Sequence, residues 1–169
     1  MNDGLKVRGD VVVIVRDGVT GRQLKRYEIR NTITNLGLGV MVQLLGQRAA
    51  DPSGPALAVG ALQIGNGTTA PAATDTALAD GSPVTILMTD SNKTPTITYP
   101  NFQLQFNVTA STSVANGKTL TEAGLFTAGS TIGGGPAYTS QLIAHQLNPA
   151  IVKTSGISVD YIWTISFST

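Results

Sequence analysis

The chain has 169 residues, 41% hydrophobic content and a formal net charge of +1, which suits one domain with its own core and gives no excess charge for binding nucleic acid. It contains no cysteine, which excludes a disulfide framework, a thiolate nucleophile and a cysteine-based metal site. No apolar run approaches the ~20 residues of a membrane helix, and the polar start Met1–Gly4 is unlike a signal peptide.

The first predicted element is a β-hairpin. Residues 6–16 contain the β-prone run Val11–Val15, and residues 23–33 form a second strand candidate. Asp17-Gly18 and Gly21 lie between them and tolerate the positive φ that hairpin loops require. We therefore expect two antiparallel strands at the start of the fold.

The hydrophobic spacing then changes from strand to helix. Leu36, Val40 and Leu44 recur every four residues, and Asn35 is a good N-cap residue. We predict one short helix near residues 35–47. A helix of this length is marginal alone, so we expect it to pack on a sheet.

Short strands separated by Gly, Asn and Pro turns are predicted for the rest of the chain. The candidates are residues 57–64, 84–89, 96–99, 102–108, 120–126, 137–147, 151–153 and 157–167, with Pro149 marking a turn. This density of strands predicts a mainly β fold, an antiparallel β-sandwich that is jelly-roll-like, in a single domain spanning residues 1–169. Within it, residues 6–30 read as a hairpin addition to a sandwich formed by residues 31–169.

The last predicted strand has the clearest pattern. Large apolar residues alternate with mainly polar ones at Ile157, Val159, Tyr161, Trp163, Ile165 and Phe167. An apolar strand at an open sheet edge would invite aggregation. We therefore predict that this strand lies in the centre of the sheet, paired on both sides.

Few residues suggest a catalytic, cofactor-binding or metal site. Gly65–Ala70 matches the G-x-G-x-x-A pattern, but no helix follows to hold a pyrophosphate, so a tight loop is expected. His145, the only histidine, lies among apolar residues and is interpreted as structural or interfacial, although one sequence does not exclude a triad assembled by the fold. Glu122 could be a general acid or a structural anchor that binds backbone amides or an arginine; we favour the anchor. We predict no catalytic residue, no cofactor and no metal.

The charges are unevenly distributed. Residues 1–48 carry 8 − 4 = +4, and residues 49–169 carry 3 − 6 = −3. Solvated strand faces explain most of this pattern, and a surface for an acidic neighbour is the functional alternative. The docking candidates are Lys6, Arg8, Arg16, Lys25, Arg26 and Arg30.

Several short motifs follow a recurring order. They are Asn35-Leu36-Gly37, Ile64-Gly65-Asn66-Gly67 with Thr76-Ala77-Leu78 downstream, Thr121-Glu122-Ala123-Gly124-Leu125-Phe126, and Leu142-Ile143-Ala144-His145 ahead of the final strand. Over about residues 31–169 this order resembles the N-terminal domain of phage tail-collar fibre proteins and related small virion proteins of tailed bacteriophages. The resemblance implies a mostly β structural domain that docks onto other virion proteins and has no catalytic residues to carry over.

Two departures from that family shape the functional expectation. Fibre proteins continue into a shaft and a receptor-binding tip, whereas this sequence ends at Thr169, and the strand pair at residues 6–30 precedes the shared pattern. We therefore expect a virion protein made in the cytoplasm of a bacterial host, most consistent with a capsid decoration (cement) protein at symmetric junctions of the particle. The expected partners are the major capsid protein or tail and fibre proteins, in a homo-oligomer with a trimer as one option, and neither nucleic acid nor membrane.

Three alternatives remain open at this point. The first is a tail or collar adaptor that attaches tail fibres. The second is a carbohydrate-binding receptor-recognition module, with Tyr27, Tyr99, Tyr138, Tyr161 and Trp163 as the aromatic residues that could stack on a sugar. The third is a small hydrolase that uses Glu122 with another acid.

Overall fold

The computed structural model describes residues 6–50, 59–88, 96–98, 103–127 and 141–168, with the backbone alone for residues 43–50 and 96–98. The described elements are β1 (Lys6–Asp17), β2 (Gln23–Ile33), α1 (Asn35–Ala50), β3 (Val59–Gly65), β4 (Val84–Leu87), β5 (Thr96–Thr98), β6 (Gln103–Ala110), β7 (Thr119–Thr127), β8 (Leu142–Val152) and β9 (Ile157–Ser168). The predicted residues 57–58, 89, 99, 102 and 137–140 lie outside the described ranges. The mainly β prediction is confirmed.

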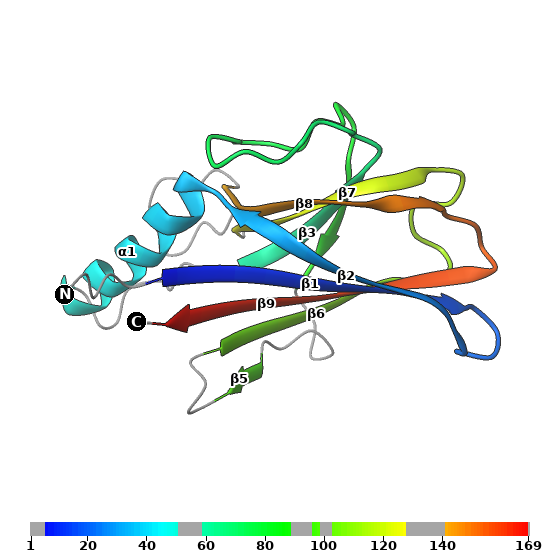
Figure 1. Cartoon of the computed structure of the whole chain (residues 1–169), viewed down its shortest axis with the longest axis horizontal. Helices are drawn as coiled ribbons and strands as arrows, with labels where there is room; N and C mark the ends of the chain where they lie inside the picture. The colour runs from blue at the N-terminus through cyan, green and yellow to red at the C-terminus, as the bar shows by residue number, and fades with distance from the viewer. Residues whose placement is uncertain (1–5, 51–58, 89–95, 99–102, 128–140, 169) are drawn as a thin grey trace.

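The described strands form one antiparallel sheet in the order β4-β3-β7-β8-β2-β1-β9-β6-β5. The sheet curls so strongly that β3, β7 and β8 come to face β1, β9 and β6, which makes it nearly closed and barrel-like (Figure 1). The predicted jelly-roll-like sandwich is not confirmed, because a sandwich needs two separate sheets. Here the two halves are joined where the end of β2 leaves β1 and pairs with β8 through Thr32–His145 and Ile33–Ala144.

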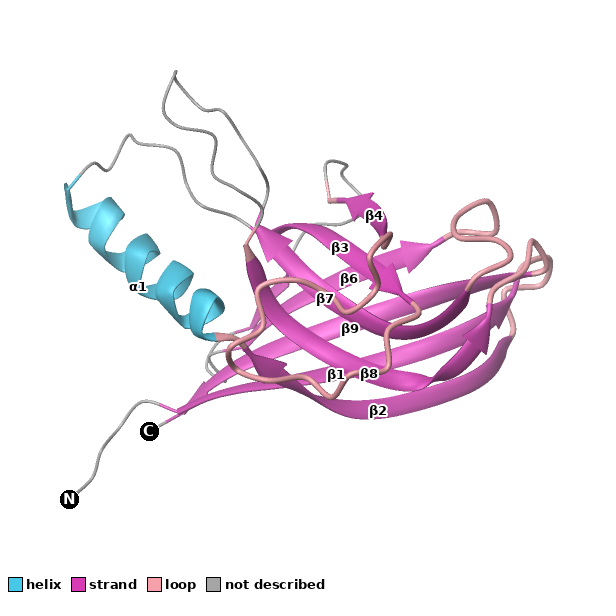
Figure 2. Cartoon of the chain, turned by 90° about the horizontal axis from the view of Figure 1, so that it is seen from above, coloured by secondary structure: helices cyan, strands magenta, loops and turns pink. Residues whose placement is uncertain are grey.

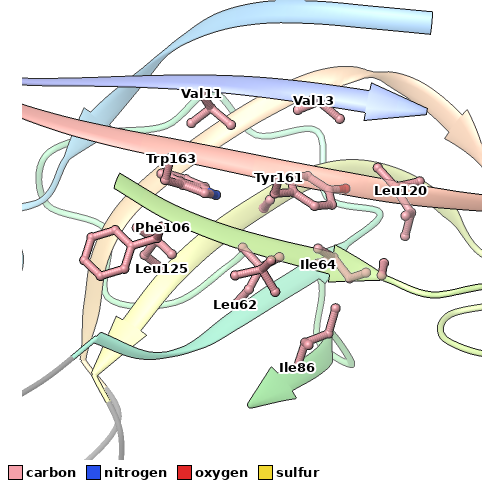
Figure 3. Close-up of a cluster of buried hydrophobic side chains, with 14 of the residues drawn as sticks. Val11, Val13, Leu62, Ile64, Ile86, Phe106, Leu120, Leu125, Tyr161 and Trp163 are labelled. Carbon is pink, nitrogen blue, oxygen red and sulfur yellow. The ribbon is translucent and has the colours of Figure 1, made fainter. Parts of the chain in front are cut away.

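The predicted central position of the last strand is confirmed. β9 pairs with β1 on one side and with β6 on the other. Its residues Tyr161 and Trp163 are fully buried and lie in one cluster with Leu62 and Leu125 from the facing half of the sheet (Figure 3). Each such side chain contributes roughly 1.5–3 kcal/mol on burial, so this cluster dominates the stability of the fold.

The hairpin of residues 6–30 contributes to the same sheet. β1 lies between β2 and β9, and Val11, Val13 and Val15 are buried in the core. Alternation of side chains across the strand then places Arg8 and Arg16 on the outer face of the sheet.

The predicted break at Pro149 is wrong, because β8 runs through it as one strand from Leu142 to Val152. The pairing of β7 with β8 shifts register between Leu120 and Glu122, where β8 holds extra residues. Proline lacks an N–H for the ladder, and a bulge accommodates it. Asn148 supports the bulge by donating from Nδ2 to the carbonyl oxygen of Leu120 at 3.1 Å.

The predicted helix is confirmed and extends to Ala50, but its N-cap differs from the prediction. Thr34 is the cap: its Oγ1 accepts a hydrogen bond from the Gly37 N–H at 2.9 Å and also donates to the Leu142 carbonyl. A Cβ on Gly37 would lie 2.2 Å from the Ile143 carbonyl oxygen, so this glycine lets the helix start directly against β8. Figure 2 shows α1 at one end of the sheet. The described part of the chain contains no helix with the length and apolar character needed to cross a membrane.

Candidate functional site

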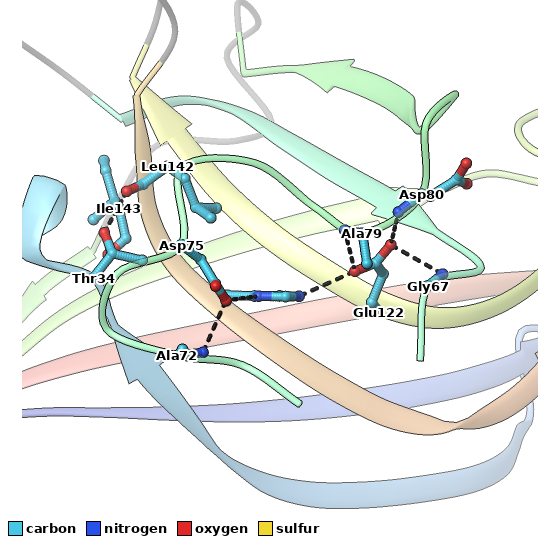
Figure 4. A network of polar contacts seen from close by, with 10 residues as sticks. Thr34, Gly67, Ala72, Asp75, Ala79, Asp80, Glu122, Leu142 and Ile143 are labelled. Carbon is cyan, nitrogen blue, oxygen red and sulfur yellow. Dashed lines mark hydrogen bonds and ion pairs between the residues drawn. The ribbon is translucent and has the colours of Figure 1, made fainter. Parts of the chain in front are cut away.

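Three titratable side chains meet on the outer side of β7 and β8. Glu122 of β7 and His145 of β8 are 0% and 2% exposed, and Asp75 belongs to the loop of residues 66–83 that covers them. His145 Nδ1 lies 2.8 Å from Asp75 Oδ2, and its Nε2 lies 3.1 Å from Glu122 Oε2. We call these three residues and the loop they hold the clamp (Figure 4).

Glu122 binds the covering loop through its backbone. Its Oε1 accepts hydrogen bonds from the N–H groups of Gly67 at 3.0 Å and Asp80 at 2.7 Å, and its Oε2 accepts one from Ala79 at 3.0 Å. With the imidazole of His145, the carboxylate has four hydrogen-bond partners, which is about its full capacity. This is the geometry of a structural anchor that uses backbone amides, and no arginine takes part.

Asp75 closes the other side of the imidazole. Burial raises the pKa of Asp75, but the Ala72 N–H and His145 lower it, so the net pKa lies below the ordinary value. Carboxylate oxygens therefore engage both ring nitrogens of His145.

The clamp leaves His145 no free nitrogen. A general base in a catalytic triad needs one nitrogen facing a nucleophile, and here both nitrogens face carboxylates. The two carboxylates also lie at opposite ends of the ring, in a row and not around a common point. In agreement with this arrangement, no cluster of metal-binding side chains is found in the described ranges.

Two glycines explain the G-x-G-x-x-A pattern. A Cβ on Gly67 would lie 2.2 Å from Glu122 Oε1, and a Cβ on Gly65 would lie 2.6 Å from the Cβ of Asp80. The residues after Gly65 form a loop, as predicted, and the glycines allow that loop to approach the carboxylate closely.

A second buried charge lies at the turn between β8 and β9. The Lys153 side chain is 0% exposed, and its ammonium group donates to Asn116 Oδ1 at 3.0 Å and to the Thr154 carbonyl oxygen at 2.9 Å. Burial lowers the pKa of Lys153. Its contacts join two turns, so its role is also structural.

The predicted docking residues divide into paired and unpaired groups. Arg8, Arg16 and Arg26 form ion pairs with Asp10 at 2.7 Å, Asp160 at 2.6 Å and Glu28 at 2.9 Å, respectively. Lys6, Lys25 and Arg30 have no ion-pair partner in the described ranges. Half of the predicted basic surface is thus neutralised within the chain.

The described aromatic candidates for sugar stacking are poorly placed for that role. Tyr161 and Trp163 are 0% exposed, and Tyr27 packs partly buried against the core. Tyr99 and Tyr138 lie outside the described residues. The described part of the chain therefore offers no open aromatic face of the kind that binds sugars.

Comparisons with protein-family models, curated proteins and solved structures found no match.

Sequence reasoning found Glu122 and His145 but missed Asp75 and Asp80. Asp75 lies 70 residues from its histidine partner, and its sequence context is that of an ordinary polar loop. The one signal in the sequence was the pair of glycines at positions 65 and 67. They indicate that the backbone comes close to another group, but they do not identify that group.

Proposed function

We propose that this chain is a structural protein of a tailed-phage particle, a capsid decoration protein that docks at symmetric junctions and stabilises them. The observation that carries the proposal is the clamp. In the described residues, the titratable side chains of the clamp are covered by the loop of residues 66–83. Their hydrogen bonds hold that loop in place. Because these groups hold a loop in place, the clamp favours a protein that binds through its outer surface over an enzyme.

The resemblance to collar proteins gains a physical basis from the same site. The Gly67 N–H of the Ile64–Gly67 motif donates to Glu122 of the Thr121–Phe126 motif, and Glu122 contacts His145 of the Leu142–His145 motif. Leu78, from the loop motif, is buried over Gly124. The motifs behind the resemblance therefore meet at one site of this fold, which supports the proposal that the chain belongs to the same structural class.

The outer surface offers the charge asymmetry that docking would use. Arg30 and Lys25 of β2 are exposed, and neither has an ion-pair partner among the described residues. A tail or collar adaptor would use the same charges, so the two locations differ in copy number and not in chemistry.

The test is binding to particles that lack this chain. Purified protein, labelled at one site, is added to such particles, and bound copies are counted at saturation. A fixed ratio to the capsid subunits supports decoration, whereas a ratio set by the tail symmetry supports the adaptor. Absence of saturable binding would overturn both. Sedimentation of the free protein tests the expected homo-oligomer.

A further inference from the structure

Two hollows flank the start of β1 and the end of β2. One, of about 450 Å³, is lined by Val7, Asn31, Ile33 and Leu38 among others, and the second, of about 350 Å³, is lined by Val12 and Glu28 among others. Arg8 and Arg30 border both hollows. We call the larger hollow the Arg30 groove.

Arg30 gives the groove an unused positive charge. Arg8 already binds Asp10, whereas Arg30 is exposed and has no hydrogen bond or ion pair from its side chain to any other described residue. A carboxylate placed over Arg30 would gain a charge-assisted hydrogen bond. Charge complementarity therefore favours an acidic partner.

Asn31 is a second, independent sign of an absent partner. It is 7% exposed and borders the larger hollow, and neither its Nδ2 nor its Oδ1 has a hydrogen-bond partner. Its amide lies over Gly9, in the place where a Cβ on that residue would stand. A buried amide without hydrogen bonds destabilises the free protein, and a peptide group can satisfy its donor and acceptor together once the side chain turns into the hollow.

The remaining lining of the groove is apolar. Val7 and Ile33 are partly buried, and Leu38 of α1 is 41% exposed. We propose, building on the structural role above, that the Arg30 groove binds an extended acidic segment of a partner protein. In this arrangement an apolar side chain packs on Ile33 and Leu38, a backbone amide pairs with Asn31, and a neighbouring carboxylate binds Arg30.

A peptide titration tests the groove without particles. The probe is acetyl-Leu-Glu-Leu-Glu-Leu-amide, added to ¹⁵N-labelled full-length protein and followed by NMR. We expect shifts at the Asn31 side-chain amide, Ile33 and Leu38, with about threefold weaker binding by Arg30→Gln and by the matched peptide that carries glutamine. Arg22→Gln, which removes an exposed charge outside the groove, should bind as the parent does.

Asn31→Leu separates a binding role from a folding role. We expect it to raise the melting temperature of the free protein and to weaken peptide binding about fivefold, because one hydrogen-bonded amide is lost. Unchanged binding by Asn31→Leu, equal affinity for both peptides, or an absence of shifts in the groove would overturn the proposal.

Particle binding then separates this inference from the proposed function. If the parent protein binds particles and Arg30→Glu binds equally well, the groove assignment is wrong and the structural role stands. If the parent protein does not bind, the structural role fails and the peptide titration alone decides the groove. Self-association of the free protein that Arg30→Glu abolishes would assign the groove to a second copy of the chain and overturn the acidic-segment proposal.

Discussion

The clamp and the Arg30 groove differ in whether their polar side chains have hydrogen-bond partners in the described chain. In the clamp, Glu122 and His145 are fully buried, and their hydrogen bonds are all made within the chain. In the groove, the buried side chain of Asn31 and the exposed side chain of Arg30 have no hydrogen-bond or ion-pair partner within the described ranges. The difference teaches that a cluster of titratable side chains can serve the fold, whereas the polar groups without partners in the described chain mark the surface that we propose for binding.

Removing the anchor should give the largest effect. Glu122→Ala leaves three backbone N–H groups and a buried imidazole without their partner, and we expect a loss of about 3–5 kcal/mol in the free energy of unfolding. Urea unfolding measures it. The matched control is Glu28→Ala, which removes an exposed carboxylate in a surface ion pair and should cost about 0–1 kcal/mol. Equal losses for the two variants would show that Glu122 is not an anchor.

The Asp75 contact should make stability sensitive to acid. Because the folded-state pKa of Asp75 lies below its ordinary value of 3.8, its contribution is present above that value and is lost as the pH falls through the folded-state pKa. Asp75→Asn should cost about 1–3 kcal/mol at neutral pH and flatten the acid side of the stability curve. Unfolding measured across this pH range checks it, and a curve parallel to that of the parent protein would count against the contact.

The cap assignment predicts a smaller loss. Thr34→Val keeps the shape of the side chain but removes the hydroxyl that caps α1, and should cost about 0.5–2 kcal/mol. Asn35→Ala is the control, because Asn35 is exposed and is not the cap. Thermal unfolding of both variants distinguishes them, and a larger effect at Asn35 would restore the prediction from sequence.

A substitution in the groove should raise the free energy of unfolding instead of lowering it. Asn31→Leu removes an amide with no hydrogen bond and should increase the free energy of unfolding by up to about 1 kcal/mol. Urea unfolding provides the value. A clear loss of stability would mean that Asn31 contributes to the free fold, and the contrast between the two regions would disappear.

The features that could be predicted from the sequence are those that depend on the local pattern of apolar and polar residues. Alternation in Ile157–Phe167 identified the central strand, since the period of two decides which face is buried. It could not show that β2 pairs with β8, which turns the expected sandwich into one curled sheet, because that contact joins residues more than 100 positions apart. Glu122 was recognised by its apolar neighbours.

The parts that escaped prediction depend on tertiary contacts. Nothing near Asp75 indicates a histidine partner, and nothing near Arg16 indicates Asp160. The six basic residues proposed for docking share a sign and a region, but the fold pairs three of them internally. Charge counts along a chain therefore overstate the charge that a surface presents.

The solvent access of the His145 ring is the most direct test of the central claim that the clamp is structural. A long-range ¹H–¹⁵N correlation spectrum of the single histidine reports on both ring nitrogens. The predicted result is that both nitrogens are hydrogen-bonded within the protein and that the ring N–H signals are protected from exchange with solvent. A ring nitrogen open to solvent would contradict the claim and would return His145 to the candidates for catalysis.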